Sequence, residues 1–179
     1  MKYLLVGCLV LFCVGCSVSA KQPALHDFGV PVSAAVNQGK VSVSVNAPTW
    51  LWDNRIRYRL LFSSPSQVRF YGLDRWIASP PEMFEQLLTF NNTQDRDYVI
   101  VIRLHDFEQQ FDTPDRSRVV MRFSVEASFD NKRKTSSQEF YLEQVNKMPD
   151  AAGAIAGFID LARKASGKIQ DWIARLPER

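Results

Sequence analysis

The sequence predicts a single α+β (mixed α/β) domain in which a largely antiparallel sheet is covered by a short central helix and a long C-terminal helix. Two segments, Val41–Asn46 and Val119–Phe129, alternate apolar and polar residues with the period of a strand that buries one face. Residues 151–175 instead repeat apolar positions with the period of an amphipathic helix. Strands interrupted by one helix and followed by another are typical of helices packed on an antiparallel sheet.

The composition is that of one globular domain. Of the 179 residues, 46% are hydrophobic and 23% are charged, which suffices for one hydrophobic core. The formal net charge of +3 is too small to indicate binding to nucleic acid. We therefore expect no nucleic acid among the partners of this protein.

The N-terminus has the features of an export signal. Lys2 precedes an apolar run, Tyr3–Val14, which is shorter than the about 20 residues that a membrane-spanning helix needs. Such a run is typical of the core of a signal peptide. We therefore expect an exported protein, and a bacterial source suits this signal.

Two processing sites compete at the end of this signal. Val14-Gly15-Cys16 resembles a lipobox, at which residues 1–15 are removed and Cys16 is lipidated, although Cys13 stands where Leu is usual. Val18-Ser19-Ala20 instead satisfies the small-residue rule of ordinary signal peptidase. All three cysteines lie within the first 16 residues, so Cys16 would be the only thiol of the mature protein. We favour lipidation of Cys16, with a polar tether over residues 16–24 and a folded domain over residues 25–179.

A hairpin is predicted after the first alternating segment. Arg55–Phe62 alternates Ile56, Tyr58 and Leu60 against three arginines. Ser63–Ser66 supplies a loop, and Gln67–Gly72 forms the second strand.

The short central helix is predicted to begin at Ser79. Ser79 can cap the helix, Pro80 suits a first turn that needs no N–H, and Glu82 lies three residues after the cap. Apolar pairs four residues apart continue the helix to about Phe90. These pairs are Met83 with Leu87 and Phe84 with Leu88.

Three more strands and the last helix complete the predicted domain. Tyr98–Leu104 is apolar on both faces, which predicts a central strand covered on two sides. Val119–Phe129 and Gln138–Val145, joined by a turn at residues 130–134, complete a meander. Asp150 caps the last helix, which runs to about Arg175. Its apolar face consists of Ile155, Phe158, Ile159, Ala162, Ala165, Ile169, Trp172, Ile173 and Leu176.

Residues that indicate catalysis are sparse. The tetrapeptide Leu-His-Asp-Phe occurs at Leu25–Phe28 and at Leu104–Phe107, and it holds the only histidines, His26 and His105. Two His and two Asp could bind a metal if these segments met, but they lack the spacing of a metal site, so we expect no metal. The chain has no G-x-S-x-G elbow, Ser-x-x-Lys signature or Gly-rich phosphate loop. We expect neither an enzyme nor a cofactor.

A stripe of arginines is the candidate binding surface. Arg55, Arg57 and Arg59 project from one side of a predicted strand, and Arg69 lies on the strand expected to pair with it. Such a stripe repels itself unless carboxylates or a partner lie over it. It is either a solvated face with acidic neighbours or a surface for an acidic protein or for phospholipid headgroups.

Three tryptophans lie close to the hairpin in the sequence. Trp50, Trp52 and Trp76 are expected to be core or loop anchors. If they are exposed, their size suits them to a protein interface.

The order of these features resembles the ABC-type transport auxiliary lipoprotein component (PqiC-like) family. The resemblance rests on the lipobox-like start, a short strand at Leu25–Gly29, an Asn-Arg-Ile and Arg-Tyr hairpin arm at Asn54–Tyr58, and the segment Leu73–Trp76 before a helix that starts with Ser-Pro. It covers about residues 25–176. Asp74, Arg75 and Trp76 form its most specific motif, and the resemblance implies that they fix the hairpin against the following helix.

The resemblance also implies a function. A member of this family is expected to be a periplasmic domain, held on the inner leaflet of the outer membrane by acyl chains on Cys16. It would serve, as a docking or structural subunit, an inner-membrane ABC transporter and an MCE-domain protein that carry lipids across the periplasm. A homo-oligomer is a further expectation from the resemblance. Ser17 favours the outer membrane, because Asp in that place is associated with inner-membrane retention.

A function of another class stays open at this point. The chain could be a periplasmic regulatory or binding lipoprotein, for instance one that activates a cell-wall synthase. The transport role predicts an ABC ATPase and a permease among the neighbouring genes, and the regulatory role predicts a synthase as partner.

The lipobox yields the first prediction. A Cys16→Ser variant should move from the membrane fraction to the soluble fraction, because it cannot carry the acyl chains that anchor the protein. Fractionation followed by immunoblotting measures this. A variant that stays in the membrane fraction would contradict lipidation at Cys16.

Overall fold

The computed structural model describes residues 21–29, 41–88, 98–129 and 134–176, and within them it confirms a single α+β domain. None of the helices in these ranges is long and apolar enough to cross a membrane. In chain order the elements are β1 (Ala24–His26), β2 (Val41–Asn46), η2 (Thr49–Leu51), β3 (Arg55–Leu60), β4 (Ser64–Trp76), α2 (Pro80–Leu87), β5 (Tyr98–Thr113), β6 (Arg116–Phe129), β7 (Lys134–Val145) and α3 (Ala151–Ile173).

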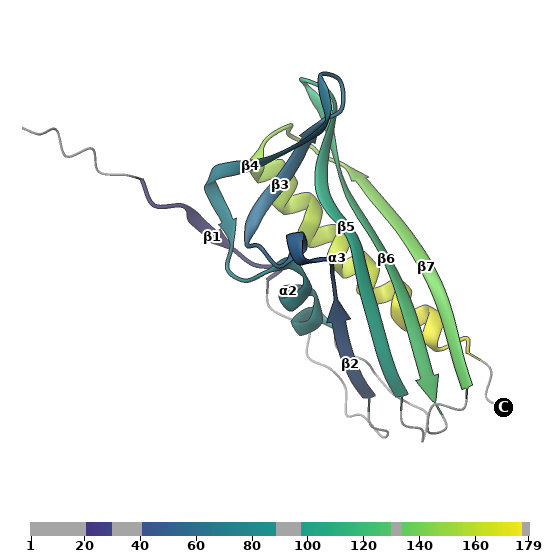
Figure 1. Cartoon of the computed structure of the whole chain (residues 1–179). Coiled ribbons are helices and arrows are strands. Elements are labelled where there is room, and N and C mark those ends of the chain that lie inside the picture. The colour runs from purple at the N-terminus through teal and green to yellow at the C-terminus, as the bar shows by residue number, and fades with distance from the viewer. Residues whose placement is uncertain (1–20, 30–40, 89–97, 130–133, 177–179) are drawn as a thin grey trace, which may run out of the picture.

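The strands form one mixed sheet of seven strands (Figure 1). Its order is β1-β4-β3-β5-β6-β7, and β2 lies beside β5. Strands β5, β6 and β7 form the predicted antiparallel meander, and β3 and β4 form the predicted antiparallel hairpin. Three shorter pairings are parallel, namely β1 with β4, β2 with β5 and β3 with β5.

One edge of β5 is divided between two partners. Strand β2 pairs with it as far as Arg103, opposite Asn46, and β3 begins to pair with it at Gln109, opposite Tyr58. The chain from Asn46 to Tyr58 has twice as many residues as the stretch of β5 that it passes, so it cannot stay extended in the sheet. It leaves the sheet and forms η2. The edge of β5 between Arg103 and Gln109 is therefore not paired with β2 or β3.

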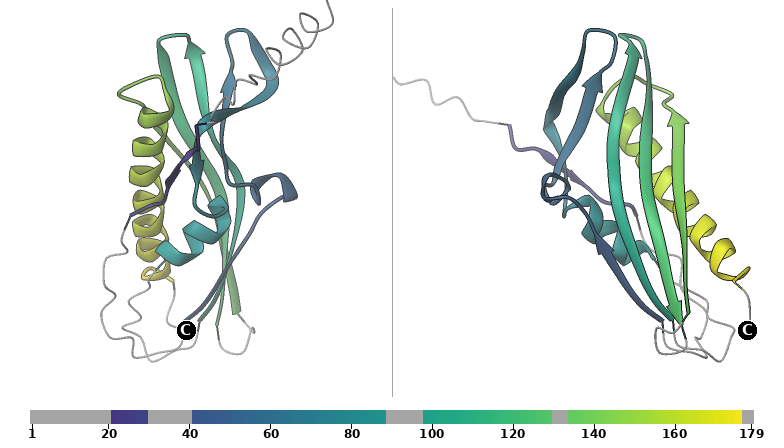
Figure 2. Two further views of the ribbon diagram at one scale, coloured as in Figure 1. Left: turned by 90° about the vertical axis from the view of Figure 1, so that its left-hand side faces the viewer. Right: turned by 45° about the vertical axis from the view of Figure 1, so that its right-hand side comes forward.

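Both helices cover the same face of the sheet, which we call the inner face. Helix α3 packs on β6 and β7, whereas α2 packs on β2 and also contacts α3. Figure 2 (left) shows α3 and the single turn of η2 on opposite sides of the sheet. The opposite face, on which η2 lies, is called the outer face below.

The central strand differs from its prediction in length and in cover. Strand β5 continues to Thr113, well beyond the predicted end at Leu104. The expectation that it is covered on two sides is wrong: Ile100 and Ile102 are buried on the inner face, but Val99 and Val101 are only half-buried. The reason is that both helices pack on the inner face.

The hairpin is longer than predicted and turns earlier. Strand β4 starts at Ser64, so the turn consists of residues 61–63 rather than Ser63–Ser66. It then extends to Trp76 instead of Gly72. Strand β7 starts at Lys134, and the predicted turn before it falls mainly on residues 130–133, outside the described part of the chain.

An aromatic cluster forms the centre of the core. Trp76 is 1% exposed, and its ring centroid lies 5.5 Å from Phe28, 6.1 Å from Phe107 and 5.8 Å from Phe158. Phe107 stacks on Phe158 of α3 at 4.1 Å. The two Leu-His-Asp-Phe segments therefore do meet, through their phenylalanines, whose centroids are 5.9 Å apart. Such ring pairs add about 0.5–1.5 kcal/mol each beyond area burial.

A buried hydrogen-bond network ties the hairpin to the meander. The Tyr71 hydroxyl donates to Gln109 Oε1 (2.7 Å), and Gln109 Nε2 donates to Ser117 Oγ (2.9 Å). Asn146 Nδ2, shortly before α3, donates to the same hydroxyl oxygen (3.1 Å). Gln109 is fully buried, and burial raises the pKa of Tyr71 above its ordinary value. These bonds allow a polar run of β5 to lie inside the fold.

Both helix starts are capped as predicted. The backbone N and the Oγ of Ser79 donate to Glu82 Oε2 at 2.9 and 2.6 Å, which lowers the pKa of that carboxyl group. Asp150 Oδ1 accepts a hydrogen bond from Gly153 N at 2.8 Å. Helix α2 ends at Leu87, and the predicted end at Phe90 lies outside the described residues.

Two glycines of α3 provide a matched pair for a stability test. A Cβ atom at Gly153 would overlap the main-chain carbonyl oxygen of Met148, whereas Gly167 has open space around it. Gly153→Ala should lower the free energy of unfolding by about 1–3 kcal/mol, because the backbone must shift. Gly167→Ala should raise it by up to about 1 kcal/mol, because Ala favours the helix. Urea unfolding measures both, and equal stability of the two variants would contradict this packing.

Candidate functional site

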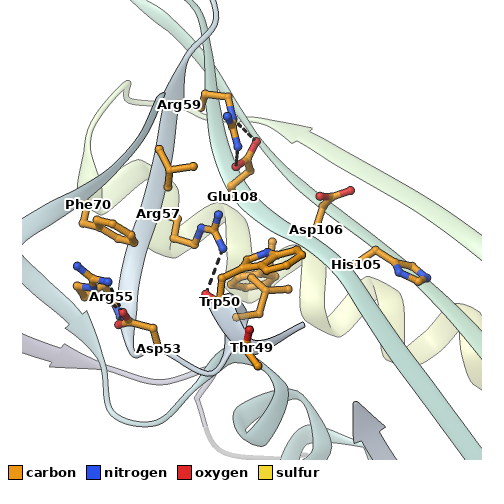
Figure 3. Close-up of a pocket in the computed structure, with 13 residues that line it drawn as sticks. Thr49, Trp50, Asp53, Arg55, Arg57, Arg59, Phe70, His105, Asp106 and Glu108 are labelled. Atoms are coloured by element: carbon orange, nitrogen blue, oxygen red, sulfur yellow. Dashed lines mark hydrogen bonds and ion pairs between the residues drawn. The ribbon is translucent and has the colours of Figure 1, made fainter. Parts of the chain in front are cut away.

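A cleft on the outer face, which we call the outer cleft, is the candidate functional site. It has a volume of about 580 Å³ and lies beside the stretch of β5 that neither β2 nor β3 pairs (Figure 3). Its lining consists of Thr49, Trp50, Leu51, Asp53, Arg55, Arg57, Arg59, Val68, Phe70, His105, Asp106, Phe107 and Glu108.

The turn of η2 forms one wall and is fixed by its apolar residue. Leu51 is 1% exposed and belongs to the core, while Trp52 Nε1 donates to the carbonyl oxygen of Ala47 at 3.1 Å. This anchoring presents Trp50 to solvent with 60% of its surface exposed, and Trp52 is 46% exposed. Of the three tryptophans near the hairpin, Trp76 is thus a core anchor and the other two are surface residues.

Three of the four predicted arginines come together in the outer cleft. Arg55, Arg57 and Arg59 alternate along β3 and all line the cleft. Arg69 does not join them, because it lies opposite Tyr58, whereas Phe70 is the residue opposite Arg57. Residues directly opposite each other share a face of the sheet, so Arg69 projects from the other face.

Two of these arginines are bound by carboxylates. Arg59 donates from Nε and Nη2 to the two carboxylate oxygens of Glu108, both at 3.1 Å, and from Nη1 to the carbonyl oxygen of Pro65 at 2.9 Å. Arg55 Nε donates to Asp53 Oδ2 at 2.6 Å, and this bond is the main cause that lowers the pKa of Asp53. The Arg55 guanidinium also lies over the ring of Phe70, 3.7 Å from its centroid.

Arg57 is bound differently from the other two. It is half-buried, and Nη1 donates to the carbonyl oxygen of Trp50 at 3.2 Å. Its Nε is buried and has no hydrogen-bond partner among the residues that the structure describes. Among the described residues that line the cleft, Arg57 is the arginine for which the structure gives no ion pair. Burial lowers the pKa of Arg57 from its ordinary value, so the surroundings disfavour the charge that it carries.

The third carboxylate of the cleft is also paired. Asp106 Oδ2 accepts a hydrogen bond from Arg122 Nε of β6 at 2.6 Å. Neighbouring His105 bonds to Ser124 Oγ at 3.0 Å. A register shift between Leu104 and Asp106 marks an irregularity of β5 at this point. Asp53, Asp106 and Glu108 therefore each bind an arginine other than Arg57.

The histidines have separate partners. His26 Nε2 lies 2.9 Å from Asp74 Oδ1, whereas His105 bonds to Ser124. In the described ranges, no three His, Cys, Asp or Glu side chains are grouped as a metal site requires. The pair formed by His26 and Asp74 joins β1 to β4 instead.

The motif Asp74-Arg75-Trp76 makes contacts other than the expected one. We expected it to fix the hairpin against the following helix. Asp74 binds His26 of β1, and Trp76 packs on Phe107 of β5 and Phe158 of α3. Arg75 lies opposite Arg55 on the hairpin, and none of the described residues forms a hydrogen bond with its buried Nε. Cys16 lies outside the described residues.

Sequence reasoning missed the acidic side of the cleft. Glu108 and Asp106 follow the predicted end of β5 at Leu104, so they were not placed on the strand that faces the arginines. Beyond Leu104, apolar and polar residues do not alternate regularly, because β5 shifts its register against β6 between Leu104 and Asp106. A signal was present in the segment from Phe107 to Phe111, in which aromatic residues flank polar ones.

Comparisons with known proteins bear on the fold. No family model matches the sequence, and no curated protein is similar enough to match it. The structure is similar to the crystal structure of protein XCC0632 from Xanthomonas campestris, of the family DUF330, with a TM-score of 0.70 at 14% identity, over 84% of this chain and 94% of that one. It is also similar to the crystal structure of an uncharacterized protein, with a TM-score of 0.66 at 12% identity, over 85% and 99% of the two chains. These likenesses show a shared fold.

The different pairing of the arginines predicts opposite effects on stability. Arg57→Met should leave the free energy of unfolding within about 1 kcal/mol of the wild type or raise it, because it removes a buried Nε–H for which the described residues offer no acceptor. Arg59→Met should lower it by about 3 kcal/mol, because Glu108 stays buried without its partner. Urea unfolding of both variants measures this. Equal losses would show that Arg57 serves the fold rather than a ligand.

Proposed function

We propose that this protein is a periplasmic accessory lipoprotein, anchored in the outer membrane, that acts as a docking or structural subunit of an ABC/MCE-type envelope lipid transport system. One observation carries the proposal: the fold agrees with that of a DUF330 protein over nearly the whole of both chains. DUF330 is the PqiC-like family, which is also the family that the motifs of the sequence resemble. Fold and motifs thus support the same assignment.

The anchor is the second part of the proposal. Lipidation at Cys16 would attach acyl chains, each buried CH₂ of which contributes about 0.8 kcal/mol to membrane binding. Several chains on one cysteine hold a protein on a membrane far more firmly than a single chain does. The tether would let the domain stand off the membrane by on the order of 26 Å. The first strand begins at Ala24, the last residue of the predicted tether.

The outer cleft suits recognition by a docking subunit. Each carboxylate that lines it is held by an arginine, and Trp50 stands exposed at its rim. Exposed tryptophans and arginines are the residues that contribute most to protein interfaces. These features favour a surface that holds a partner over one that transforms a substrate.

Co-purification tests the transport role. A tagged copy of the full chain, expressed in its own bacterium and extracted with mild detergent, should carry with it an MCE-domain protein. Cys16→Ser, which removes the proposed anchor, serves as the control. Less of the MCE-domain protein should co-purify with this variant than with the wild type. Mass spectrometry identifies the co-purified chain. Recovery of a cell-wall synthase without an MCE-domain protein would contradict the transport role and support the regulatory one.

A further inference from the structure

The Nε–H of Arg57 finds no acceptor among the described residues, and Arg57 lines a cleft that is open to solvent. Its Nε is buried, and within the described part of the chain its guanidinium makes one hydrogen bond, from Nη1 to the Trp50 carbonyl oxygen. An unsatisfied buried donor destabilises the fold, and it does so more strongly if the group is charged. Figure 3 shows this guanidinium between the Arg59–Glu108 pair and Trp50, where a ligand entering the cleft can reach it.

The carboxylates around Arg57 favour a ligand that carries a single negative charge. Asp53 is bound by Arg55, Glu108 by Arg59 and Asp106 by Arg122, so none of these carboxylates forms an ion pair with Arg57, and only their longer-range charge favours its protonated form. A ligand with one anionic group can pair with Arg57 and leave the other three ion pairs intact. A ligand with several anionic groups meets three carboxylates close to its binding point, and they repel it.

The walls of the cleft favour a protein ligand. Trp50 offers a large exposed aromatic surface beside Arg57, and Phe70 provides a further apolar wall across the hairpin. The edge of β5 between Arg103 and Gln109 is not paired with β2 or β3, which leaves its main chain without a neighbouring strand beside the cleft. An extended peptide can combine an ion pair, an aromatic contact and main-chain hydrogen bonds at such a place.

We infer that the outer cleft is the receptor for an acidic segment of a partner protein, in which one Asp or Glu carboxylate forms a forked ion pair with Arg57 and a neighbouring apolar side chain packs on Trp50. The planar guanidinium group matches the two oxygens of a carboxylate. This inference rests on the proposed docking function and names the chemistry by which the partner is held.

A lipid surface fits these observations less well than a protein segment. A membrane presents many phosphates at once, whereas Asp53, Asp106 and Glu108 also line the cleft in which Arg57 lies and would repel them. A single phosphodiester carries the required negative charge. It lacks the neighbouring apolar side chain that would pack on Trp50 and the main chain that would reach the edge of β5. A headgroup phosphate is therefore the alternative that the test must exclude.

The test is a titration followed by NMR of the isotope-labelled full chain carrying Cys16→Ser, which removes the proposed anchor. The probes are a capped hexapeptide with a central Phe-Glu pair, the same peptide with Gln in place of Glu, and glycerophosphoethanolamine, a phospholipid headgroup without acyl chains. The indole N–H of Trp50 and the Nε–H of Arg57 report on the cleft. The variant is Arg57→Gln, and the matched control is Arg69→Gln, which alters the same hairpin on its other face.

We expect the Glu peptide to shift both resonances. The dissociation constant should rise at least about tenfold with the Gln peptide or with Arg57→Gln, which corresponds to about 1.4 kcal/mol. Arg69→Gln should bind the Glu peptide as the wild type does, since its bonds run to Gln67 outside the cleft. The spectrum of each variant also shows whether it is folded.

Four results would overturn the inference. They are equal binding of the Glu and Gln peptides, undiminished binding to Arg57→Gln, absence of binding, and tighter binding of glycerophosphoethanolamine than of the Glu peptide through Arg57. The last result would assign the site to a phosphate. The titration does not depend on the transport partner. Binding of the Glu peptide together with a failed co-purification would support the peptide-binding cleft and contradict the transport role. A failed titration together with a successful co-purification would support the transport role and contradict the peptide-binding cleft.

Discussion

The outer face of this protein is organised by the way β5 shares one of its edges. Two consecutive strands, β2 and β3, both run parallel to β5 along that edge, and the chain that joins them is too long to remain in the sheet. The excess chain forms η2, which is anchored by Leu51 and exposes Trp50. The interruption, the cleft beside it and the exposed tryptophan are therefore consequences of a single strand arrangement. Because α3 and α2 cover only the inner face, nothing in the described part of the chain covers this arrangement from outside.

In the outer cleft, two arginines stabilise the fold through ion pairs, whereas the arginine that is available for recognition costs stability. Arg55 and Arg59 are neutralised within the fold, and Arg59 shields a nearly buried carboxylate. Arg57 lies between them with its charge disfavoured by burial. The core tolerates this cost because the aromatic cluster around Trp76 and the network around Gln109 hold the hairpin, the meander and α3 together. The hydrogen bond from Arg57 Nη1 to the Trp50 carbonyl oxygen orients this side chain, which lowers the entropy lost when a ligand binds.

Periodic features of the sequence were sufficient to predict the elements that rely on local rules. Helix α3 follows from its apolar period and Asp150, and β6 follows from its alternation, because each buries one face against a single layer. The position of Arg69 could not be obtained in the same way. Hairpin register depends on where the turn lies, and an early turn at residues 61–63 placed Phe70, not Arg69, opposite Arg57.

Long-range partners account for the other differences. Glu108 and Gln109 look unlike strand residues in the sequence, but Arg59 and Tyr71 satisfy them from another hairpin. Trp76 and Trp50 are equally hydrophobic in the sequence, yet one lies in the core and the other in solvent, because η2 leaves the sheet. Contacts between distant segments decide such cases, and a local pattern does not contain them.

The pairing of β1 with β4 gives the protein a mechanical property. Any pull on the chain before Ala24 reaches the fold through β1, which pairs in parallel with Asp74, Arg75 and Trp76. A force along this strand loads its backbone bonds, the 2.9 Å contact of His26 with Asp74 and the bond from Ile77 N to the His26 carbonyl oxygen together, in shear. Two residues later, the ring of Phe28 transmits the load to Trp76 in the core. A strand of only three residues can thus transfer a force on the preceding chain to the folded domain.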